Sequence, residues 1–239
     1  MYVDMHAHIL PCADHGSNSV ETSLQQLEMA VAAGVDTVVA TTHFYKHSDT
    51  VNEFLARRDA AFDVLCNAAP VELRKKLHIV LGAEVTLELG LEELEGLEKL
   101  CLGNTKNILI EMPSGLWTPW VFSSLRCIMK DRGLRPIVAH VDRYFNNNLL
   151  NDLLDLDLPL QVNASSFEGF RSRRKIMKLV EDGSVHYLGS DIHGVSDEYE
   201  SFAKAVKRLG DYMESITEDS RIAIGQKEQN SPFRPIRMV

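Results

Sequence analysis

Short apolar segments alternate with amphipathic segments along most of the chain, and this alternation constrains the fold more than any other feature. The apolar segments have the length of β-strands, and the segments between them repeat apolar residues three and four positions apart, as helices do. The expected strands are 2–5, 35–41, 77–85, 107–112, 135–139, 158–163 and 185–190. The expected helices are 20–33, 49–69, 91–100, 118–132, 147–156, 172–181 and 199–213.

Repeated strand–helix units predict an α/β protein built on a parallel sheet. Neither a linker nor a shift in composition divides the 239 residues, so we expect one domain over 1–239, with an irregular tail from about residue 218. At this length a closed or nearly closed β/α barrel is favoured over an open sheet.

Composition excludes several classes of protein. The net charge of −9 is spread along the chain and offers no basic footprint for nucleic acid. No stretch approaches the roughly 18 apolar residues that a membrane span needs, and we expect neither membrane insertion nor a signal peptide. Cys12, Cys66, Cys101 and Cys127 are scattered, which is typical of reduced thiols in a cytoplasmic protein.

Histidines and carboxylates stand where the expected strands end. His6 and His8 form an HxH pair, whose side chains point the same way in extended chain and can bind one divalent metal. His15 follows in a turn-like segment. The other residues at strand ends are His43, Glu84, Glu111, His140, Asp191 and His193.

Taken singly, these residues have ordinary explanations: a strand-end carboxylate is usually solvated, and a lone histidine is often a satisfied polar residue. Taken together they indicate a metal site, because the C-terminal ends of parallel strands meet on one face. His47, His78 and His186 lack this placement, and we expect no role for them in the site.

Seven motifs, in order from residue 2 to about 194, carry a resemblance to a known family. They are DMHAHILP (4–11), ATTH (40–43), GAE (82–84), ILIEMP (108–113), IVAHVDRY (137–144), VNA (162–164) and GSDIH (189–193). In these motifs the chain resembles the polymerase-and-histidinol-phosphatase (PHP) phosphoesterases. Within that family it is most similar to the bacterial capsule-type metal-dependent protein-tyrosine phosphatases, the CpsB/YwqE group.

The resemblance implies a distorted (β/α)7 barrel that holds two or three divalent ions, manganese first, with iron or zinc as alternatives. The implied ligands are His6, His8, Glu84 and Asp191 for the first ion, Glu84, Glu111 and His140 for the second, and His15, His43 and His193 for the third. These six imidazoles and three carboxylates bring a charge of about −3 against +6 from three ions, and the surplus suits a phosphate dianion.

The resemblance also implies a phosphatase that acts on phosphotyrosine in a bacterial tyrosine kinase controlling capsular or exopolysaccharide synthesis. A hydroxide that bridges two metals, held via Glu84, would attack phosphorus while Arg143 binds the phosphate oxygens. A cysteine-dependent phosphatase is excluded, because none of the four cysteines has an arginine six residues later; Arg132 lies only five residues beyond Cys127.

Two departures from the capsule phosphatases keep alternatives open. His15 stands where that group typically has aspartate and where histidinol-phosphatase-like relatives have histidine. Residues 195–201 also lack the arginine that often follows the SDxH motif. The first alternative is therefore a small-molecule phosphomonoesterase of the histidinol-phosphatase type. The second is a non-catalytic metal-bearing module, which loss of ligands would mark.

Overall fold

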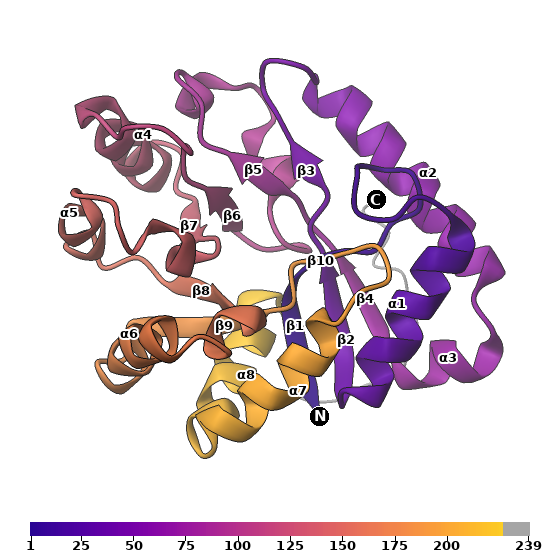
Figure 1. The fold of residues 1–239 in the computed structure, drawn as a ribbon. Coiled ribbons are helices and arrows are strands. Elements are labelled where there is room, and N and C mark those ends of the chain that lie inside the picture. The colour runs from indigo at the N-terminus through magenta and orange to yellow at the C-terminus, as the bar shows by residue number, and fades with distance from the viewer. Residues whose placement is uncertain (227–239) are drawn as a thin grey trace.

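Two parallel sheets form the centre of the fold in the computed structural model, which describes residues 1–226 (Figure 1). One sheet has the strand order β10-β1-β2-β4 and the other has the order β3-β5-β6-β7-β8-β9. The strands are β1 (Tyr2–His8), β2 (Val35–Ala40), β3 (His43–Phe44), β4 (His78–Leu81), β5 (Glu84–Thr86), β6 (Asn107–Glu111), β7 (Arg135–Val138), β8 (Leu160–Asn163), β9 (Val185–Gly189) and β10 (Ile192–His193). The predicted parallel α/β architecture is thereby confirmed.

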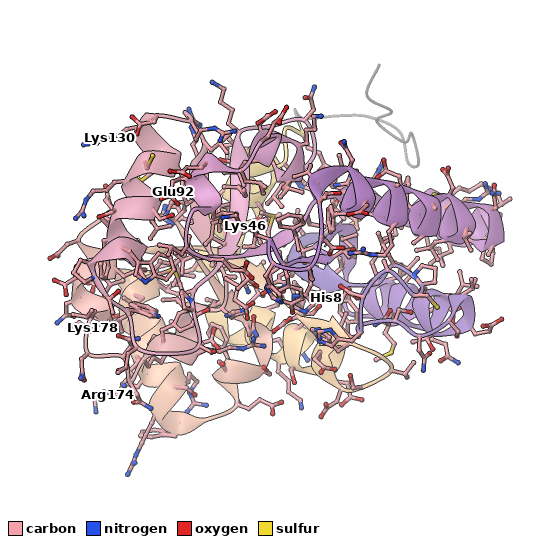
Figure 2. All side chains as sticks on the ribbon, turned by 90° about the horizontal axis from the view of Figure 1, so that it is seen from above. His8, Lys46, Glu92, Lys130, Arg174 and Lys178 are labelled. Carbon is pink, nitrogen blue, oxygen red and sulfur yellow. The ribbon has the colours of Figure 1, made fainter. Side chains whose placement is uncertain are left out.

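The helices lie around the outside of the strands (Figure 1). They are α1 (Val20–Ala32), α2 (Val51–Ala68), α3 (Val71–Lys76), α4 (Pro119–Lys130), α5 (Leu150–Leu154), α6 (Phe170–Glu181), α7 (Glu198–Leu209) and α8 (Tyr212–Ala223). Each of them, within residues 1–226, is too short or too polar to cross a bilayer. Charged side chains such as Lys130 and Arg174 project outward, whereas His8 lies among side chains in the middle of the view (Figure 2).

The expectation of a single strand over 77–85 was wrong. The strand is interrupted after β4. The next strand, β5, belongs to the other sheet, where it pairs with β3 and β6. Gly82 sits at the break, and a Cβ there would lie 2.6 Å from the Leu102 side chain. A larger residue at position 82 would therefore have to displace the packed Leu102 side chain. The break moves Glu84 from the end of a long strand to the start of a short one.

Two helix expectations also need correction. Residues 91–100 form two 3₁₀ turns, Leu91–Glu93 and Leu97–Leu100, because Gly96 between them has a φ of +80°. The helix expected over 199–213 ends at Gly210, where φ is +54°, and α8 begins afterwards. The tail expected to be irregular from about 218 is helical to Ala223, and its remainder from 227 lies outside the described residues.

A bulge in β1 determines which way its histidines point. Asp4 pairs with Val38 of β2 and Ala7 pairs with Ala40, so β1 advances by three residues while β2 advances by two. An extra residue in a strand reverses the alternation of side chains beyond it. Val3 and Met5 therefore face the inner cluster before the bulge, and His6 and His8 are turned to the same side after it, while Ala7 packs with the outer core.

The inner cluster connects the two sheets. It contains buried side chains from both sheets, and the end of α8 covers it. Its members are Val3, Met5, Val39, Val80, Leu102, Leu109, Ile137, Ala139, Tyr187, Ala223 and Ile224. Above this apolar layer the strand register brings polar residues together: His43 is the partner of Glu84, Thr86 of Glu111, and His8 of His193. The inner cluster is thus the apolar layer directly beneath the polar centre.

Candidate metal centre

The two imidazoles at the end of β1 form the middle of the centre. His6 and His8 are buried, and their Nε2 atoms lie 3.1 Å apart. Two unprotonated ring nitrogens repel each other at that separation unless a proton or a cation lies between them. The pair therefore offers two converging ligand atoms.

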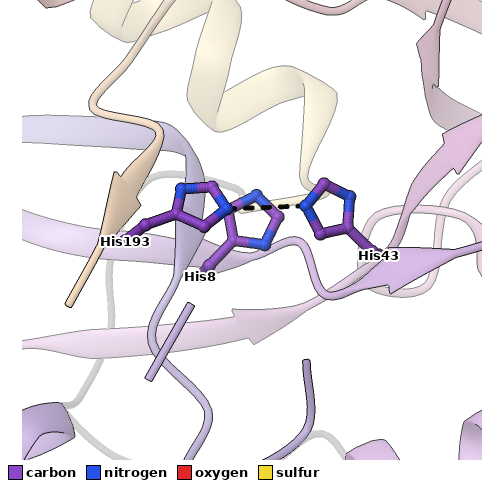
Figure 3. Close-up of side chains that lie close together, drawn as sticks. All are labelled: His8, His43 and His193. Atoms are coloured by element: carbon purple, nitrogen blue, oxygen red, sulfur yellow. Dashed lines mark hydrogen bonds between the residues drawn. The ribbon is translucent and has the colours of Figure 1, made fainter. Parts of the chain in front are cut away.

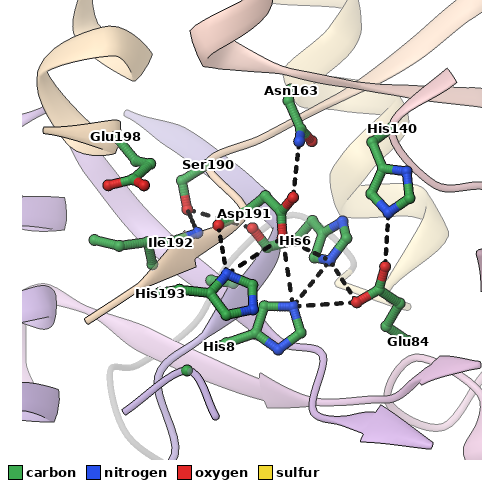
Figure 4. Close-up of polar contacts among 12 residues, drawn as sticks. His6, His8, Glu84, His140, Asn163, Ser190, Asp191, Ile192, His193 and Glu198 are labelled. Carbon is green, nitrogen blue, oxygen red and sulfur yellow. Dashed lines mark hydrogen bonds and ion pairs between the residues drawn. The ribbon is translucent and has the colours of Figure 1, made fainter. Parts of the chain in front are cut away.

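Two buried carboxylates complete this first group. Glu84 Oε2 lies 3.2 Å from the Nε2 atom of His6 and 3.2 Å from that of His8. Asp191 Oδ1 lies 3.4 Å and 3.5 Å from the same two atoms (Figure 4). The four donor atoms lie within 4.8 Å of one another, and all four residues are buried. This is the set that the sequence resemblance implies for the first ion.

A second group surrounds the other side of Glu84. His140 Nε2 lies 2.8 Å from Glu84 Oε1 and 3.7 Å from Glu111 Oε1. His43 also belongs here, since its donor atom lies within 4.8 Å of those of Glu84 and Glu111. Thr86 donates a hydrogen bond of 2.8 Å to Glu111 Oε2. The structure thus brings His43, as well as His140, to the two carboxylates that the resemblance implies for the second ion.

A third group is made of imidazoles alone. His8, His43 and His193 place donor atoms within 4.8 Å of one another, and the Nε2 atoms of His43 and His193 are 3.5 Å apart (Figure 3). His15 is exposed at the rim, with its ring stacked 4.6 Å from that of His43 and 4.8 Å from that of His193. Its donor atoms are outside the three groups, although the ring touches the third one.

Backbone strain coincides with two of the predicted ligands. His140 has a φ of +31° and Asp191 a φ of +56°, which non-glycine residues rarely adopt. Such a conformation costs on the order of 1–3 kcal/mol and concentrates at functional sites. Each residue lies two positions after the end of a strand, β7 or β9, so the turn redirects its side chain toward the centre.

Partners behind the rings fix which nitrogen faces the centre. His8 Nδ1 lies 2.8 Å from Asp14 Oδ2, and His193 Nδ1 lies 2.9 Å from the carbonyl oxygen of Asp191. A carboxylate or carbonyl oxygen can only accept, so both Nδ1 atoms carry the proton. The Nε2 atoms of His8 and His193 are left to bind an ion, which is the usual arrangement of metal-binding histidines.

The charges of the centre shift one another's pKa. Burial alone would raise the pKa of Glu84, but His6, His140 and His43 outweigh it and hold that pKa well below its usual value. Burial would likewise raise the pKa of Asp191, but His6, His8 and Arg143 lower it. Both carboxylates are therefore ionised, and acceptor-only, across the neutral range.

The imidazoles split into two kinds. Burial acts to lower the pKa of His8, but the nearby carboxylates of Asp14, Asp191 and Glu84 raise it well above 6.5. Burial and the neighbouring charge of His8 lower the pKa of His193 to about 4. At pH 7 the metal-free centre thus holds a second proton on His8, at Nε2, whereas His193 is already neutral.

Metal binding is therefore expected to release a proton from His8. The apparent affinity should rise with pH until the raised pKa of His8 is passed, because the ion and the proton compete for Nε2. Calorimetric titration with manganese in two buffers of different ionisation enthalpy measures the proton count. Asp14→Asn removes a partner that raises the pKa of His8, so proton release at pH 7 should decrease. Equal heats in both buffers for the unmodified protein would contradict this expectation.

The residues present fit a divalent ion. Glu84 Oε2 and His43 Nδ1 are buried and lie 2.9 Å apart, yet neither has a hydrogen-bond partner among residues 1–226. An unsatisfied buried polar atom costs about 1–3 kcal/mol, and an ion between such atoms removes that cost. Mixed nitrogen and oxygen donors suit manganese, iron or zinc better than calcium.

Replacing His15 with alanine tests its place at the rim. We expect the variant to lose occupancy of one ion and to keep the ion in the group around Glu84, which His15 does not touch. Elemental analysis after dialysis gives the stoichiometry. His47→Ala is the matched control, because His47 is also exposed but pairs with Glu88 at 2.6 Å. Unchanged metal content and turnover in the His15 variant would make it a surface residue.

Arg143 extends over the edge of the centre. It lies on the turn Val141–Tyr144 that follows His140, and half of its side chain is exposed. Its Nη2 donates to Asp191 Oδ2, and its Nη1 lies 3.9 Å from Glu111 Oε1. Asp142, the neighbour that could have neutralised it, accepts from Asn163 and Ser166 instead. A guanidinium is thereby held beside two carboxylates of the centre.

Several residues of the centre were missed at the level of sequence. Asp14 accepts from the backbone nitrogen of His43 at 3.0 Å as well as from His8. Gln161 and Asn163 of β8 contact His6 and Asp191 respectively, and Tyr144 lies 3.2 Å from His140 Nδ1. Asn163 and Tyr144 stand within two of the motifs that carry the family resemblance, VNA and IVAHVDRY, but the sequence assigned a role to neither; for Asp14 the signal was its position after HxH.

The thiols do not join the centre. Burial raises the pKa of Cys66 to about 11 and that of Cys101 to about 12. A hydrogen bond to Asp131 raises the pKa of Cys127. A thiol with a raised pKa is a poor nucleophile at neutral pH. The sequence-based exclusion of a cysteine-dependent reaction agrees with these surroundings.

Comparison with known proteins places this arrangement in a family. The protein-tyrosine phosphatase YwqE of Bacillus subtilis (strain 168) is 32% identical over 203 residues, which are 81% of this chain and 78% of that protein. The phosphatase CpsB of Streptococcus pneumoniae is 29% identical over 207 residues, 81% of this chain and 83% of that protein.

Solved structures show the same fold. A crystal structure from a study of YwqE of Bacillus subtilis and CpsB of Streptococcus pneumoniae, described there as unique metal-dependent tyrosine phosphatases, matches with a TM-score of 0.74 at 21% identity. The match covers 99% of this chain and 100% of that one. A β-aspartyl dipeptidase from Fervidobacterium islandicum matches with a TM-score of 0.55 at 13% identity, over 93% of this chain and 72% of that one. The model of one family, capsular polysaccharide synthesis CpsB/CapC, matches residues 2–224, and the chain belongs to that family.

Proposed function

We propose that the protein is a metal-dependent protein-tyrosine phosphatase that hydrolyses phosphotyrosine on a bacterial tyrosine kinase regulating capsular or exopolysaccharide synthesis. One observation carries the proposal: a set of buried and partly buried imidazoles and carboxylates in three overlapping groups, with the half-exposed Arg143 at its edge. The names of the relatives in Bacillus and Streptococcus support the reaction.

The fold we propose is a distorted (β/α)7 barrel of the PHP type, as one phosphoesterase domain over 1–239. The two sheets support it, because their strands share the inner cluster and meet at both seams. Asp191 N donates to His6 O at 2.7 Å at one seam, and at the other the neighbouring strands β2 and β4 continue along the chain into the neighbouring strands β3 and β5 of the second sheet.

The centre would hold two or three divalent ions, manganese first, with iron or zinc as alternatives. His6, His8, Glu84 and Asp191 would hold the first, Glu84, Glu111 and His140 the second, and His15, His43 and His193 the third. His43 lies near both of the last two groups and can serve either. When bound, such ions make a water acidic enough to ionise near pH 7 and attract the phosphate.

The chain's own residues supply position and charge. Arg143 is placed to donate two parallel hydrogen bonds to phosphate oxygens, a geometry that a guanidinium provides and an ammonium does not. Asp14 and the carbonyl of Asp191 hold the rings of His8 and His193. A tyrosyl leaving group, with a pKa of about 10, departs with little protonation, so the reaction needs no strong general acid.

We propose that the phosphatase acts in the cytoplasm. All four cysteines lie within the described residues and are free thiols, which is usual in a reducing compartment.

A small-molecule phosphomonoesterase of the histidinol-phosphatase type is the alternative that one observation favours. His15 stacks on His43 and His193, so an imidazole adjoins the third group where the capsule phosphatases typically have aspartate. A non-catalytic module is disfavoured, since all the ligands that the family resemblance implies are present.

Phosphate release by the metal-reconstituted protein tests the proposal. A tyrosine-phosphorylated peptide and histidinol phosphate are compared at equal concentration, with and without a chelator. We expect higher kcat/KM on the peptide and loss of activity on chelation. Preference for histidinol phosphate would establish the alternative, and chelator-resistant turnover would exclude the metal chemistry.

A further inference from the structure

Two buried amides lie directly behind the metal ligands. Gln161 and Asn163 are two residues apart on β8, so their side chains point the same way. Gln161 is fully buried and Asn163 is 5% exposed. A buried amide has both a donor and an acceptor end and is stable only when each end finds its complement. Its partners therefore reveal its orientation.

One backbone group determines the orientation of Gln161. The backbone nitrogen of His140 lies 2.7 Å from Gln161 Oε1, and a backbone N–H can only donate. This atom of the amide is therefore the oxygen. The same oxygen lies 3.1 Å from His6 Nδ1. Because the oxygen cannot donate, the proton of this contact sits on Nδ1, and His6 Nε2 is left to face His8 and Glu84.

The other end of the amide fixes a carboxylate. Gln161 Nε2 donates to Asn163 Oδ1 at 2.9 Å, so the amide nitrogen of Asn163 is free to donate to Asp191 Oδ2 at 2.8 Å. Arg143 donates to the same oxygen. Asp191 Oδ1 is thereby left toward His6 and His8 (Figure 4).

The space around Gln161 is shaped for it. Gly189 of β9 is the register partner of Asn163, and a Cβ on Gly189 would lie 2.6 Å from Gln161 Nε2 and 2.6 Å from His6 Cβ. Any side chain at position 189 would push the amide and the imidazole apart. The contact between Gln161 and His6 thus depends on a glycine in the neighbouring strand.

We propose that Gln161 is a positioning residue that sets His6 in its Nδ1–H tautomer and, through Asn163, aims one oxygen of Asp191 at the same ion. A single amide ties together three ligands on three different segments of the chain. The role at the loaded centre rests on the proposed metal-dependent function. The tautomer does not, because it follows from hydrogen bonds within the protein alone.

Nitrogen NMR of the metal-free protein tests the tautomer directly. Two-bond and three-bond correlations between ring nitrogens and carbon-bound protons distinguish Nδ1–H from Nε2–H imidazoles at alkaline pH, where the rings are neutral. The His6 signals are assigned by their absence in His6→Gln. We expect the Nδ1–H form in the unmodified protein. An Nε2–H form there would overturn the proposal without the need for any variant of Gln161.

Two variants separate the two arms of the amide. Gln161→Met keeps the side-chain volume and removes both the hydrogen bond to His6 and the hydrogen bond to Asn163 that orients Asp191. His6 should therefore lose its single tautomer, and the dissociation constant for manganese should rise about 10- to 100-fold. Asn163→Ala removes the hydrogen bond to Asp191 but leaves the contact between Gln161 and His6. It should therefore weaken manganese binding while His6 stays in the Nδ1–H form. Manganese affinity is read by calorimetry and folding by circular dichroism.

The control is another buried glutamine. Gln26 of α1 is fully buried and donates to the carbonyl of Gly194 at 2.9 Å and to the backbone carbonyl of His8 at 3.4 Å, but it has no bond to a ligand ring. Gln26→Met should leave the His6 tautomer unchanged. A folded Gln161→Met protein with an intact tautomer and unchanged manganese affinity would make Gln161 merely a packing residue. Failure of the phosphatase assay alone would leave the tautomer result standing and would count against the proposed function instead.

Discussion

Glu84→Gln is expected to lower kcat/KM on a phosphotyrosine peptide by at least about 10³-fold, the scale on which a charge next to the reacting group acts in a dry site. Glu84 lies within 3.2 Å of ring nitrogens of His6, His8, His43 and His140, and it belongs to two of the three donor groups. Glutamine keeps the shape but loses the charge, and its N–H₂ would point at nitrogens that must bind an ion. Metal loss at two positions follows.

Metal content distinguishes this cause from misfolding. Elemental analysis of Glu84→Gln should show fewer ions per chain, while circular dichroism should show a native spectrum. Glu88→Gln is the control, since Glu88 pairs with the exposed His47 and should change kcat/KM less than about twofold, as expected for a surface pair. A Glu84→Gln protein with full metal content and full activity would remove this carboxylate from the centre.

Arg143→Ala is expected to keep the metals and the fold but lose on the order of 10²-fold in kcat/KM, the equivalent of one charged transition-state contact of about 3 kcal/mol. Arg143 is half exposed, so it can reach a substrate, and it is anchored by Asp191. Residues 195–201 contain no arginine that could also bind the phosphate. Arg143→Lys should recover only part of the loss, because an ammonium cannot bind two oxygens in parallel.

The matched control for Arg143 is an arginine far from the centre. Arg174 of α6 is exposed and projects outward, so Arg174→Ala should change neither kcat nor KM (Figure 2). The kinetic split is informative as well. A rise in KM with kcat unchanged would mean that Arg143 binds substrate and transition state equally. Unchanged kinetics in the alanine variant, with metal content verified, would show that the centre holds phosphate without Arg143.

The sequence predicted the architecture and the positions of the polar residues because both follow from local patterns. Apolar runs of strand length and helical periodicity give the alternation, and alternation gives parallel sheets. His43, Glu111, His140 and Asp191 were found because each stands where an apolar run stops. Their convergence then required only that parallel strands end on one face.

What the sequence could not predict depends on contacts between distant segments. The bulge in β1 arises from its register with β2, and without it His6 and His8 would face the helices. The break at Gly82 reflects the close approach of Leu102, 20 residues later in the chain. No periodicity in a single strand reports either of these.

The supporting residues were hidden for a similar reason. Gln161 lies inside an apolar strand and is brought to His6, 155 residues away, only by the order of the strands. Asp14 belongs to the same turn-like segment as His15, but its contact with His8 depends on how the turn folds back over β1. The ligands carry a chemical signature, whereas the residues that orient them are ordinary amides and carboxylates.

The pairing of β1 with β10 has a consequence for how the protein is made. Ala7 and His8 are the register partners of Ile192 and His193. A ribosome adds about 5–20 residues per second, so the edge of β1 that β10 covers stays open for about ten to forty seconds after β1 is complete. During that interval the nascent chain has its HxH pair but lacks Asp191, and an exposed strand edge is the kind of surface that chaperones protect. The group that needs Asp191 and the group that needs His193 can therefore form only after translation has passed residue 193, whereas His43, Glu84 and Glu111 are synthesised earlier.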